Sequence, residues 1–206
     1  MSRQKTPEKR RSILDAAREL FGTQGYHCTN IADIAERLGM GHGTFYRYFK
    51  SKRDIFQHVL NDITGRIVAV AITENPSAAN DVAAYRGQVE RIAEALFQLF
   101  GDDPATARVF FFEAQGVDDE MRGSIDNAFL VMQQFTARYL DNGVSKGFLR
   151  KDLDVEVCAR AVNAMSFEAI RQTITAKNKR LEAARWRRAI VALMFDGIAE
   201  QATPVG

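Results

Sequence analysis

A short stretch near the N-terminus, residues 42–49, concentrates side chains that can form hydrogen bonds. His42, Thr44, Tyr46, Arg47 and Tyr48 supply an imidazole, three hydroxyls and a guanidinium. Hydroxyls and cations of this kind bind phosphate oxygens, and side chains at the start of a helix can reach the edges of nucleic-acid bases. The stretch is therefore a candidate surface for binding a polyanion such as DNA.

The charge distribution favours the same interpretation. Residues 1–60 carry 11 Lys and Arg against 6 Asp and Glu, a net charge of +5, and the other 146 residues carry 17 against 20, a net charge of −3. A basic N-terminal segment on a mildly acidic remainder indicates a polyanionic partner. A solvated basic face explains the same composition, so the charge alone leaves both interpretations open.

Two apolar rings lie within the same stretch. Phe45 and Phe49 are four residues apart, so on a helix they share one face and can hold it against a core. The tyrosines could be core residues as well, but a short helix rarely buries rings on every side. We therefore expect Tyr46 and Tyr48 to remain available to a partner.

Length and composition limit what can position this stretch. The 206 residues are 46% hydrophobic with a net charge of +2, which excludes a largely disordered chain. No run approaches the ~18–20 apolar residues that span a bilayer. The polar N-terminus lacks a signal-peptide pattern, and Cys28 and Cys158 are too far apart for a disulfide framework or zinc ribbon. The sequence predicts a soluble cytoplasmic protein with no membrane partner, metal or cofactor.

Helical spacing dominates the chain, and strand signals are nearly absent. Thr6-Pro7 predicts the start of a first helix, and a second, short helix follows Thr29. A glycine-containing turn leads to a third helix over residues 44–49, and a capping box at Ser51 starts a longer helix that ends near residue 75. Two short helices joined in this way form a helix-turn-helix, whose second helix can enter the major groove of DNA.

The rest of the chain is also expected to be helical. The pattern predicts helices over residues 79–100, 104–115, 119–142, 154–176 and 180–202. The last two carry broad faces of small and apolar residues, which one subunit alone would leave exposed. The sequence therefore predicts an all-α fold that dimerises mainly through these two helices.

Phenylalanines are concentrated between residues 97 and 135. The three consecutive rings at 110–112 sweep about 200° of a helix at ~100° per residue, so they cannot all face one core wall. Either that helix is buried all round or some rings line a cavity for an apolar small molecule. Ordinary core packing explains the cluster equally well. The residues expected to line a cavity are Phe97, Phe100, Phe111, Phe112, Gln115, Phe129 and Met132.

The stretch from Thr29 to Lys52, TNIADIAERLGMGHGTFYRYFKSK, resembles the DNA-binding domain of the tetracycline-repressor (TetR) family of bacterial regulators. The preceding apolar residues from Ile13 to Tyr26 are similar to the first helix of that family. The resemblance is specific over about residues 8–60. Over residues 61–206 it is architectural only, because several helices with two long ones at the end match the family's ligand-binding and dimerisation domain.

The resemblance implies roles for individual residues. Thr29 would cap the second helix and offer its hydroxyl to phosphate, and Lys52 would lie near the DNA backbone. The tip of the recognition helix would read bases, and the two tyrosines would contact phosphates. The DNA-binding residues implied are Thr29, His42, Gly43, Thr44, Tyr46, Arg47, Tyr48 and Lys52. One departure is Gly41, which stands where many members have a serine or another capping side chain.

Other kinds of site fit the sequence less well. The run Gly39-x-Gly41-x-Gly43 lacks the Gly-Lys-Ser/Thr ending of a phosphate loop and follows a helix instead of a strand. The three histidines and Cys28 match no compact metal-binding spacing. No Ser/His/Asp arrangement with supporting context is present, so an enzyme is not expected.

Two classes of function remain. The first is a ligand-responsive repressor that binds a palindromic operator as a homodimer and is released by a small apolar or amphipathic effector. The second is a helical small-molecule-binding or interaction protein with a vestigial helix-turn-helix. For either class the sequence predicts a helix-turn-helix domain over residues 1–52, a connecting helix over 51–75 and a ligand-binding and dimerisation domain over 76–206.

Overall fold

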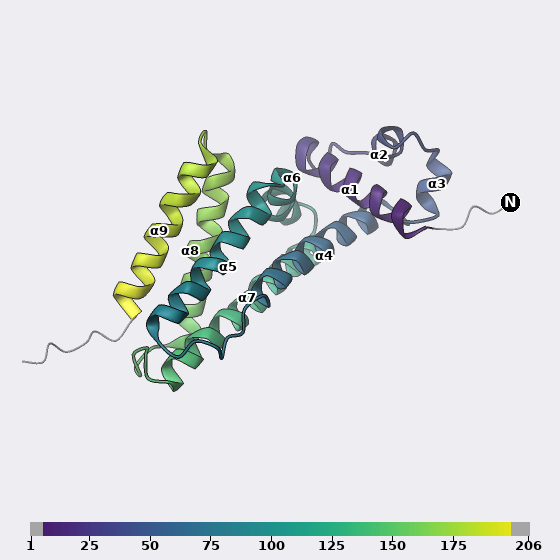
Figure 1. The fold of residues 1–206 in the computed structure, drawn as a ribbon. Helices are drawn as coiled ribbons and strands as arrows, with labels where there is room; N and C mark the ends of the chain where they lie inside the picture. The colour runs from purple at the N-terminus through teal and green to yellow at the C-terminus, as the bar shows by residue number, and fades with distance from the viewer. Residues whose placement is uncertain (1–5, 199–206) are drawn as a thin grey trace, which may run out of the picture. The chain divides into compact units, whose positions relative to one another are not determined.

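A computed structural model describes residues 6–198 (Figure 1). These residues contain no β-strand, which confirms the all-α fold class. The α-helices are α1 (Pro7–Gln24), α2 (Ile31–Arg37), α3 (His42–Tyr46), α4 (Lys52–Ala71), α5 (Val82–Gly101), α6 (Pro104–Arg108), α7 (Asp119–Ser145), α8 (Val155–Thr175) and α9 (Lys179–Ile198). A π-helical segment, Val109–Glu113, and a 3₁₀ turn, Ala114–Gly116, follow α6.

The chain divides into two compact units that do not follow chain order. The head unit holds the described residues up to Arg66 together with Asp103–Asn127. The body unit holds Ile67–Asp102 and the described residues from Ala128 onward. The segment 103–127 therefore folds with the helix-turn-helix, although the sequence-based division placed it in the C-terminal domain. The functional division at residues 52 and 76 stays a prediction.

Local capping starts the first helix of the head unit as expected. The hydroxyl of Thr6 accepts a hydrogen bond from the backbone N–H of Lys9 at 3.3 Å, and Pro7 opens α1. The apolar face of α1 is buried from Ile13 to Gly22. Gly22 lies where α1 meets α6, and a Cβ there would come within 2.5 Å of Ala105 Cα. Glycine is therefore required for this close helix contact.

The second helix begins one residue later than the resemblance implied. Asn30 is the N-cap of α2, and its backbone N–H donates to the Asp33 carboxylate at 2.7 Å. Thr29 is therefore not the cap, and the expectation that it caps this helix is wrong. Gly39 then adopts φ +58°, a left-handed conformation that glycine tolerates without steric cost, and this turns the chain toward α3.

Several predicted helices differ in extent from those observed, and residues 199–202 of the helix expected over 180–202 lie outside the described residues. The recognition helix α3 begins two residues early, with Gly41 as its N-cap, and ends at Tyr46. The connecting helix α4 ends at Ala71, several residues before Pro76. The helix expected over 104–115 has only five α-helical residues before it widens into the π-helical segment. The change from α-helical to π-helical hydrogen bonding could not be predicted, because it does not alter the spacing of apolar residues in the sequence.

The body unit is a bundle of long helices. Helix α5 contacts both α8 and α9, and α8 and α9 run against each other (Figure 1). The hydroxyl of Tyr139 on α7 donates to the carbonyl oxygen of Glu74 at 3.0 Å, and the Lys146 ammonium donates to that of Ser77 at 2.7 Å. These bonds fix the loop that connects α4 to α5.

Candidate DNA-binding surface and ligand cavity

The recognition helix α3 is held by two buried rings. Phe45 is 0% and Phe49 1% exposed, and their centroids are 5.9 Å apart. The opposite side of α3 is turned to solvent, with His42 and Gly43 exposed and Tyr46 54% exposed. The expected separation between anchoring phenylalanines and accessible hydrogen-bonding groups is therefore present.

The end of this segment lies against the start of α1. The backbone N–H of Thr6 donates to the hydroxyl oxygen of Tyr48 at 3.4 Å. The guanidinium of Arg10 lies 5.0 Å from the centre of the Phe49 ring and contacts Nδ1 of His58 at 3.1 Å. The basic start of α1 and the polar end of the recognition segment thus form one continuous surface.

Several cations on this surface have no carboxylate partner. Among the described residues, no carboxylate lies within ion-pair distance of Lys9, Arg10, Arg47, Lys50 or Lys52. We call these five residues the basic cluster. Elsewhere in the head unit most arginines are paired with Asp or Glu. Because the cluster adjoins α3, its uncompensated charge lies where a phosphate backbone would need it.

Two of the implied DNA contacts are engaged within the protein. Thr29 is fully buried, and both its hydroxyl and its N–H donate to the carbonyl oxygen of Gly25, at 2.8 and 3.2 Å. The Lys52 ammonium donates to the carbonyl oxygen of Tyr26 at 2.9 Å and lies 4.5 Å from the centre of that ring. Both residues therefore hold the loop between α1 and α2, and their contact with DNA stays a prediction.

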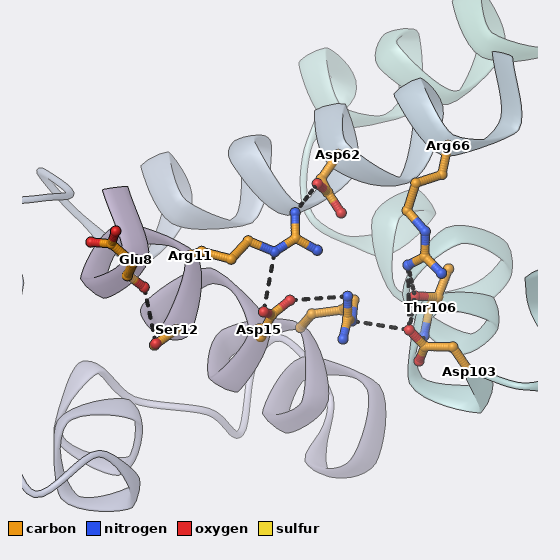
Figure 2. A network of polar contacts seen from close by, with 9 residues as sticks. Glu8, Arg11, Ser12, Asp15, Asp62, Arg66, Asp103 and Thr106 are labelled. Carbon is orange, nitrogen blue, oxygen red and sulfur yellow. Dashed lines mark hydrogen bonds and ion pairs between the residues drawn. The ribbon is translucent and has the colours of Figure 1, made fainter. Parts of the chain in front are cut away.

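A polar network holds α1 against α4 and α6 (Figure 2). Arg11 pairs with Asp62 of α4, and Arg18 lies 3.3 Å from the carboxylate of Asp103. The same carboxylate accepts from Arg66 at 3.4 Å and from the Thr106 hydroxyl at 2.7 Å. Burial alone would raise the pKa of Asp103, but these hydrogen bonds and the two arginine charges hold it below its ordinary value.

A second set of bonds fixes the helix-turn-helix from the segment 109–120. The Glu113 carboxylate accepts from the backbone N–H of Tyr26 at 2.8 Å. Arg53, at the start of α4, binds the carboxylates of Asp118 at 2.8 Å and Glu120 at 2.6 Å. The hydrogen bond from Arg53 lowers the pKa of Asp118. These contacts were not expected from the sequence, because they join residues far apart in the chain.

A cavity of about 80 Å³ lies inside the body unit. Side chains of α5, α7, α8 and α9 enclose it, and Ala71 at the end of α4 also lines it. The lining is mostly apolar and aromatic, with rings from Phe97, Phe135 and Phe167. One water needs roughly 10–15 Å³ measured in this way, so the space is large enough for part of an organic ligand.

The seven residues expected to line a cavity separate into two groups. Phe97 and Met132 line it, and Phe129 packs on the lining ring of Phe167 with centroids 4.7 Å apart. Phe100 is fully buried but does not border the cavity. Phe111, Phe112 and Gln115 belong to the head unit and do not line it. The Phe-rich segment 110–112 is therefore not part of this site.

The polar groups of the cavity were not predicted from the sequence. Asn163 on α8 and Arg187 on α9 line it, and the Asn163 Nδ2 and Arg187 Nε atoms are buried without a hydrogen-bond partner. The Arg187 guanidinium also forms an ion pair with Glu94 on α5. In the sequence they are an isolated asparagine and an isolated arginine on otherwise apolar helix faces. That pattern points to a polar site only once the packing of the helices is known.

Other kinds of site have little support within residues 6–198. No three His, Cys, Asp or Glu side chains of this part gather where they could hold a metal ion. No helix in the same part is both long and apolar enough to cross a bilayer.

Comparisons with known proteins agree with this geometry. The family model described as "Bacterial regulatory proteins, tetR family" matches residues 13–59. The "Fatty acid metabolism regulator protein" of Bacillus subtilis is 26% identical over 199 residues, covering 95% of this chain and 98% of the relative. The "HTH-type transcriptional repressor KstR2" of Mycobacterium tuberculosis is 24% identical over 164 residues, covering 79% and 80%.

Solved structures share the fold over nearly the whole chain. A transcriptional regulator from Saccharomonospora viridis in complex with choline is 25% identical, with a TM-score of 0.79 over 95% of this chain and all of that chain. The fatty acid degradation regulator FadR from Bacillus halodurans is 21% identical, with a TM-score of 0.74 over 95% and 98%. The helix-turn-helix and the family match identify residues 13–59 as a DNA-binding domain of the TetR family of bacterial regulatory proteins, and the chain is similar over nearly its whole length to transcriptional regulators.

Proposed function

We propose that this protein is a repressor that binds a palindromic operator as a homodimer and is released by a small apolar or amphipathic effector. The observation that carries the DNA-binding part is the exposed face of α3 beside the basic cluster. There, hydrogen-bonding side chains and cations without carboxylate partners occupy one surface. Such a surface combines base readout from the start of the helix with phosphate contacts around it.

DNA binding is tested by fluorescence anisotropy with a labelled fragment from upstream of the protein's own gene. Arg47→Ala removes an arginine of the basic cluster and should lower the salt dependence of log K by about 1 per subunit. Arg108→Ala is the control, because Arg108 is an exposed arginine of the head unit that likewise has no carboxylate partner among the described residues, but it lies on α6. Equal salt slopes for the two variants would contradict the proposed surface.

Base readout requires a separate pair of variants. His42→Ala and Thr44→Ala should reduce the ratio of operator to random-sequence affinity, because each mismatched contact at a base edge typically costs ~1–3 kcal/mol. Tyr46→Phe keeps the ring and removes only the hydroxyl, so its effect isolates one phosphate contact. Uniform weakening on both DNAs after the His42 and Thr44 substitutions would exclude base readout by these residues.

Exposed apolar residues on the last two helices support dimerisation. Val157, Ala161 and Ala164 are exposed at helical spacing on α8, and Leu181 and Leu193 on α9 are 54% and 60% exposed. A two-fold interface over these helices would present two recognition helices to the two half-sites of an operator. Light scattering at micromolar concentration should give about twice the 23.1 kDa chain mass, and Leu193→Glu should shift the protein toward monomer.

The cavity in the body unit supports control by a small molecule. Two similar proteins are named for fatty acid metabolism or degradation, and one similar structure contains choline, so organic effectors are the class to test. Helix α4 begins at Lys52 in the head unit and reaches the cavity wall at Ala71 in the body unit. A ligand that displaces Ala71 could therefore change the spacing of the recognition helices.

Linkage makes this control measurable. Ligand should lower operator affinity, and operator should lower ligand affinity, by the same factor, with a coupling of about 1–3 kcal/mol. Calorimetric titrations of ligand with and without operator measure the factor directly. Ligands that fill the cavity but leave operator affinity unchanged would contradict control by release.

A further inference from the structure

The cavity of the body unit has one feature that an apolar ligand alone does not explain. Of the described side chains that line it, only Arg187 carries a formal charge. The hydroxyls of Ser166 and Tyr139 also border it, but they donate to the carbonyl oxygens of Val162 and Glu74. Of the described side chains that line the cavity, only Arg187 and Asn163 carry a buried polar atom without a hydrogen-bond partner.

Arg187 determines which kind of group is missing. Its Nε atom is buried without a partner, whereas its Nη1 atom pairs with the Glu94 carboxylate. A guanidinium has donors and no acceptor, so the buried Nε–H can be satisfied only by an acceptor. Buried polar groups are nearly always hydrogen-bonded, and an orphaned one in a cavity wall is explained when a ligand supplies its partner.

Asn163 on the neighbouring helix can adapt to the same ligand. The Thr136 hydroxyl lies 3.0 Å from Oδ1 of Asn163 and 3.1 Å from the carbonyl oxygen of Met132. The hydroxyl can donate to Oδ1 of Asn163, or it can donate to the Met132 carbonyl oxygen and accept from the NH2 group of a turned-over Asn163 amide. The amide can therefore turn either end toward the cavity. Arg187 therefore determines that the polar group of the ligand is an acceptor that favours negative charge, and Asn163 adds a second hydrogen bond to it.

We propose that the effector of this cavity is an amphipathic molecule whose polar end is an anionic acceptor, a carboxylate, held by Arg187 and Asn163. Its apolar tail would lie among the rings of α5, α7 and α8. Carboxylates accept from guanidinium groups in a charge-assisted and often bidentate way. Glu94 is the internal competitor, because it occupies Arg187 until the ligand carboxylate shares or replaces it. This inference deepens the proposed ligand control and rests on it.

Three eight-carbon probes separate the possible end groups by calorimetry on the full chain without DNA. Octanoate presents an anionic acceptor, 1-octanol a neutral hydroxyl, and octyltrimethylammonium a cation like that of choline. Octanoate should bind about tenfold or more tightly than 1-octanol, and octyltrimethylammonium should bind least. Because the readout is ligand binding alone, failure of DNA release leaves this test unaffected.

Variants assign the preference to the named side chains. Arg187→Met keeps the apolar stem and should bring the octanoate-to-octanol affinity ratio down to about 1 while octanol affinity changes by less than about threefold. Glu94→Gln frees the guanidinium and should tighten octanoate by about three- to tenfold. Arg185→Met is the matched control on α9, since Arg185 is exposed and pairs with Glu182 outside the cavity.

Each contrary outcome overturns the inference. Equal binding of octanoate and octanol would make the Arg187–Glu94 pair structural only. Tightest binding of octyltrimethylammonium would make Glu94 the recognising group. Retention of the octanoate preference in a folded Arg187→Met protein would place the anion elsewhere, and no binding of any probe to the folded wild-type protein would show that the cavity does not hold an alkyl carboxylate.

Discussion

The two units differ in where their charged side chains find partners. In the head unit, arginines and carboxylates from different helices neutralise one another at the packing surfaces, and the cations without carboxylate partners lie next to α3. In the body unit, two side chains that line the cavity, Asn163 and Arg187, carry a buried polar atom without a hydrogen-bond partner. The comparison indicates that the head unit presents a fixed surface, whereas the body unit has an unfilled interior that a small molecule can complete.

The largest effect expected concerns the anchor of the recognition helix. Phe45→Ala removes a fully buried ring that holds α3, and should destabilise the head unit by about 3–5 kcal/mol and abolish operator binding. Tyr46→Ala, at the adjacent exposed ring, should change stability by less than about 0.5 kcal/mol yet still weaken operator binding. Urea unfolding and anisotropy measure both. Similar stability losses in the two variants would remove the distinction between anchor and contact.

The same contrast explains what the sequence could predict. The helix-turn-helix was predictable because residues within about twenty positions define it, so Phe45 and Tyr46 separate into buried and exposed by helical spacing alone. Thr29 was misassigned as a cap because Asn30, next to it, is an equally good capping residue. Thr29 is instead buried, with its hydroxyl bonded to the carbonyl oxygen of Gly25, and the spacing of residues in the sequence does not predict that contact.

The ligand cavity was only partly predictable, because its wall comes from four helices that are distant in sequence. Phe97 and Met132 line the cavity, and their contact with a ligand stays a prediction, whereas Phe111 and Phe112 follow the break at α6 and fold with the head unit. The composition of the segment shows that aromatic rings are present, but it does not show into which of the two units each ring packs. Arg187 was missed for the same reason, since an arginine in a helix usually reads as solvent-facing.

The next largest effect tests the claim that charges in the head unit are structural. Asp103→Ala leaves Arg18 and Arg66, which are 18% and 33% exposed, without their shared carboxylate, and should cost about 1–3 kcal/mol in urea unfolding. Asp152→Ala is the control in the body unit, because Asp152 is 82% exposed and 3.8 Å from Arg150. That control should change stability by less than about 0.5 kcal/mol. Equal losses would show that the head unit does not depend on this network.

A third prediction concerns a substitution that fills the cavity of the body unit. Ala93→Leu adds apolar volume at the cavity wall, and should stabilise the protein by about 0.5–2 kcal/mol while weakening any cavity ligand. Ala83→Leu, at an exposed position on the same helix, is the control and should do neither. Thermal unfolding with and without octanoate measures both effects. If the ligand-induced shift survives in Ala93→Leu, the ligand binds outside the cavity.

The smallest effect expected is a pH dependence on the surface of α8. The Arg171 guanidinium, together with the Gln172 amide, lowers the pKa of Glu168 to about 2, from its ordinary 4.5. A carboxylate whose pKa is depressed by folding contributes stability above its unfolded pKa and loses it as the pH falls toward the folded pKa. The contribution should therefore be complete at pH 7 and decline between about pH 4.5 and pH 2.

Exposed pairs three residues apart on a helix contribute only ~0.2–0.5 kcal/mol and are screened by salt. Glu168→Gln should accordingly lower stability slightly at pH 7, lose that difference on acidification and lose it in 1 M salt (roughly a 3 Å Debye length). A difference that grows as the pH falls would contradict the assigned sign and would place Glu168 among the residues that fold protonated.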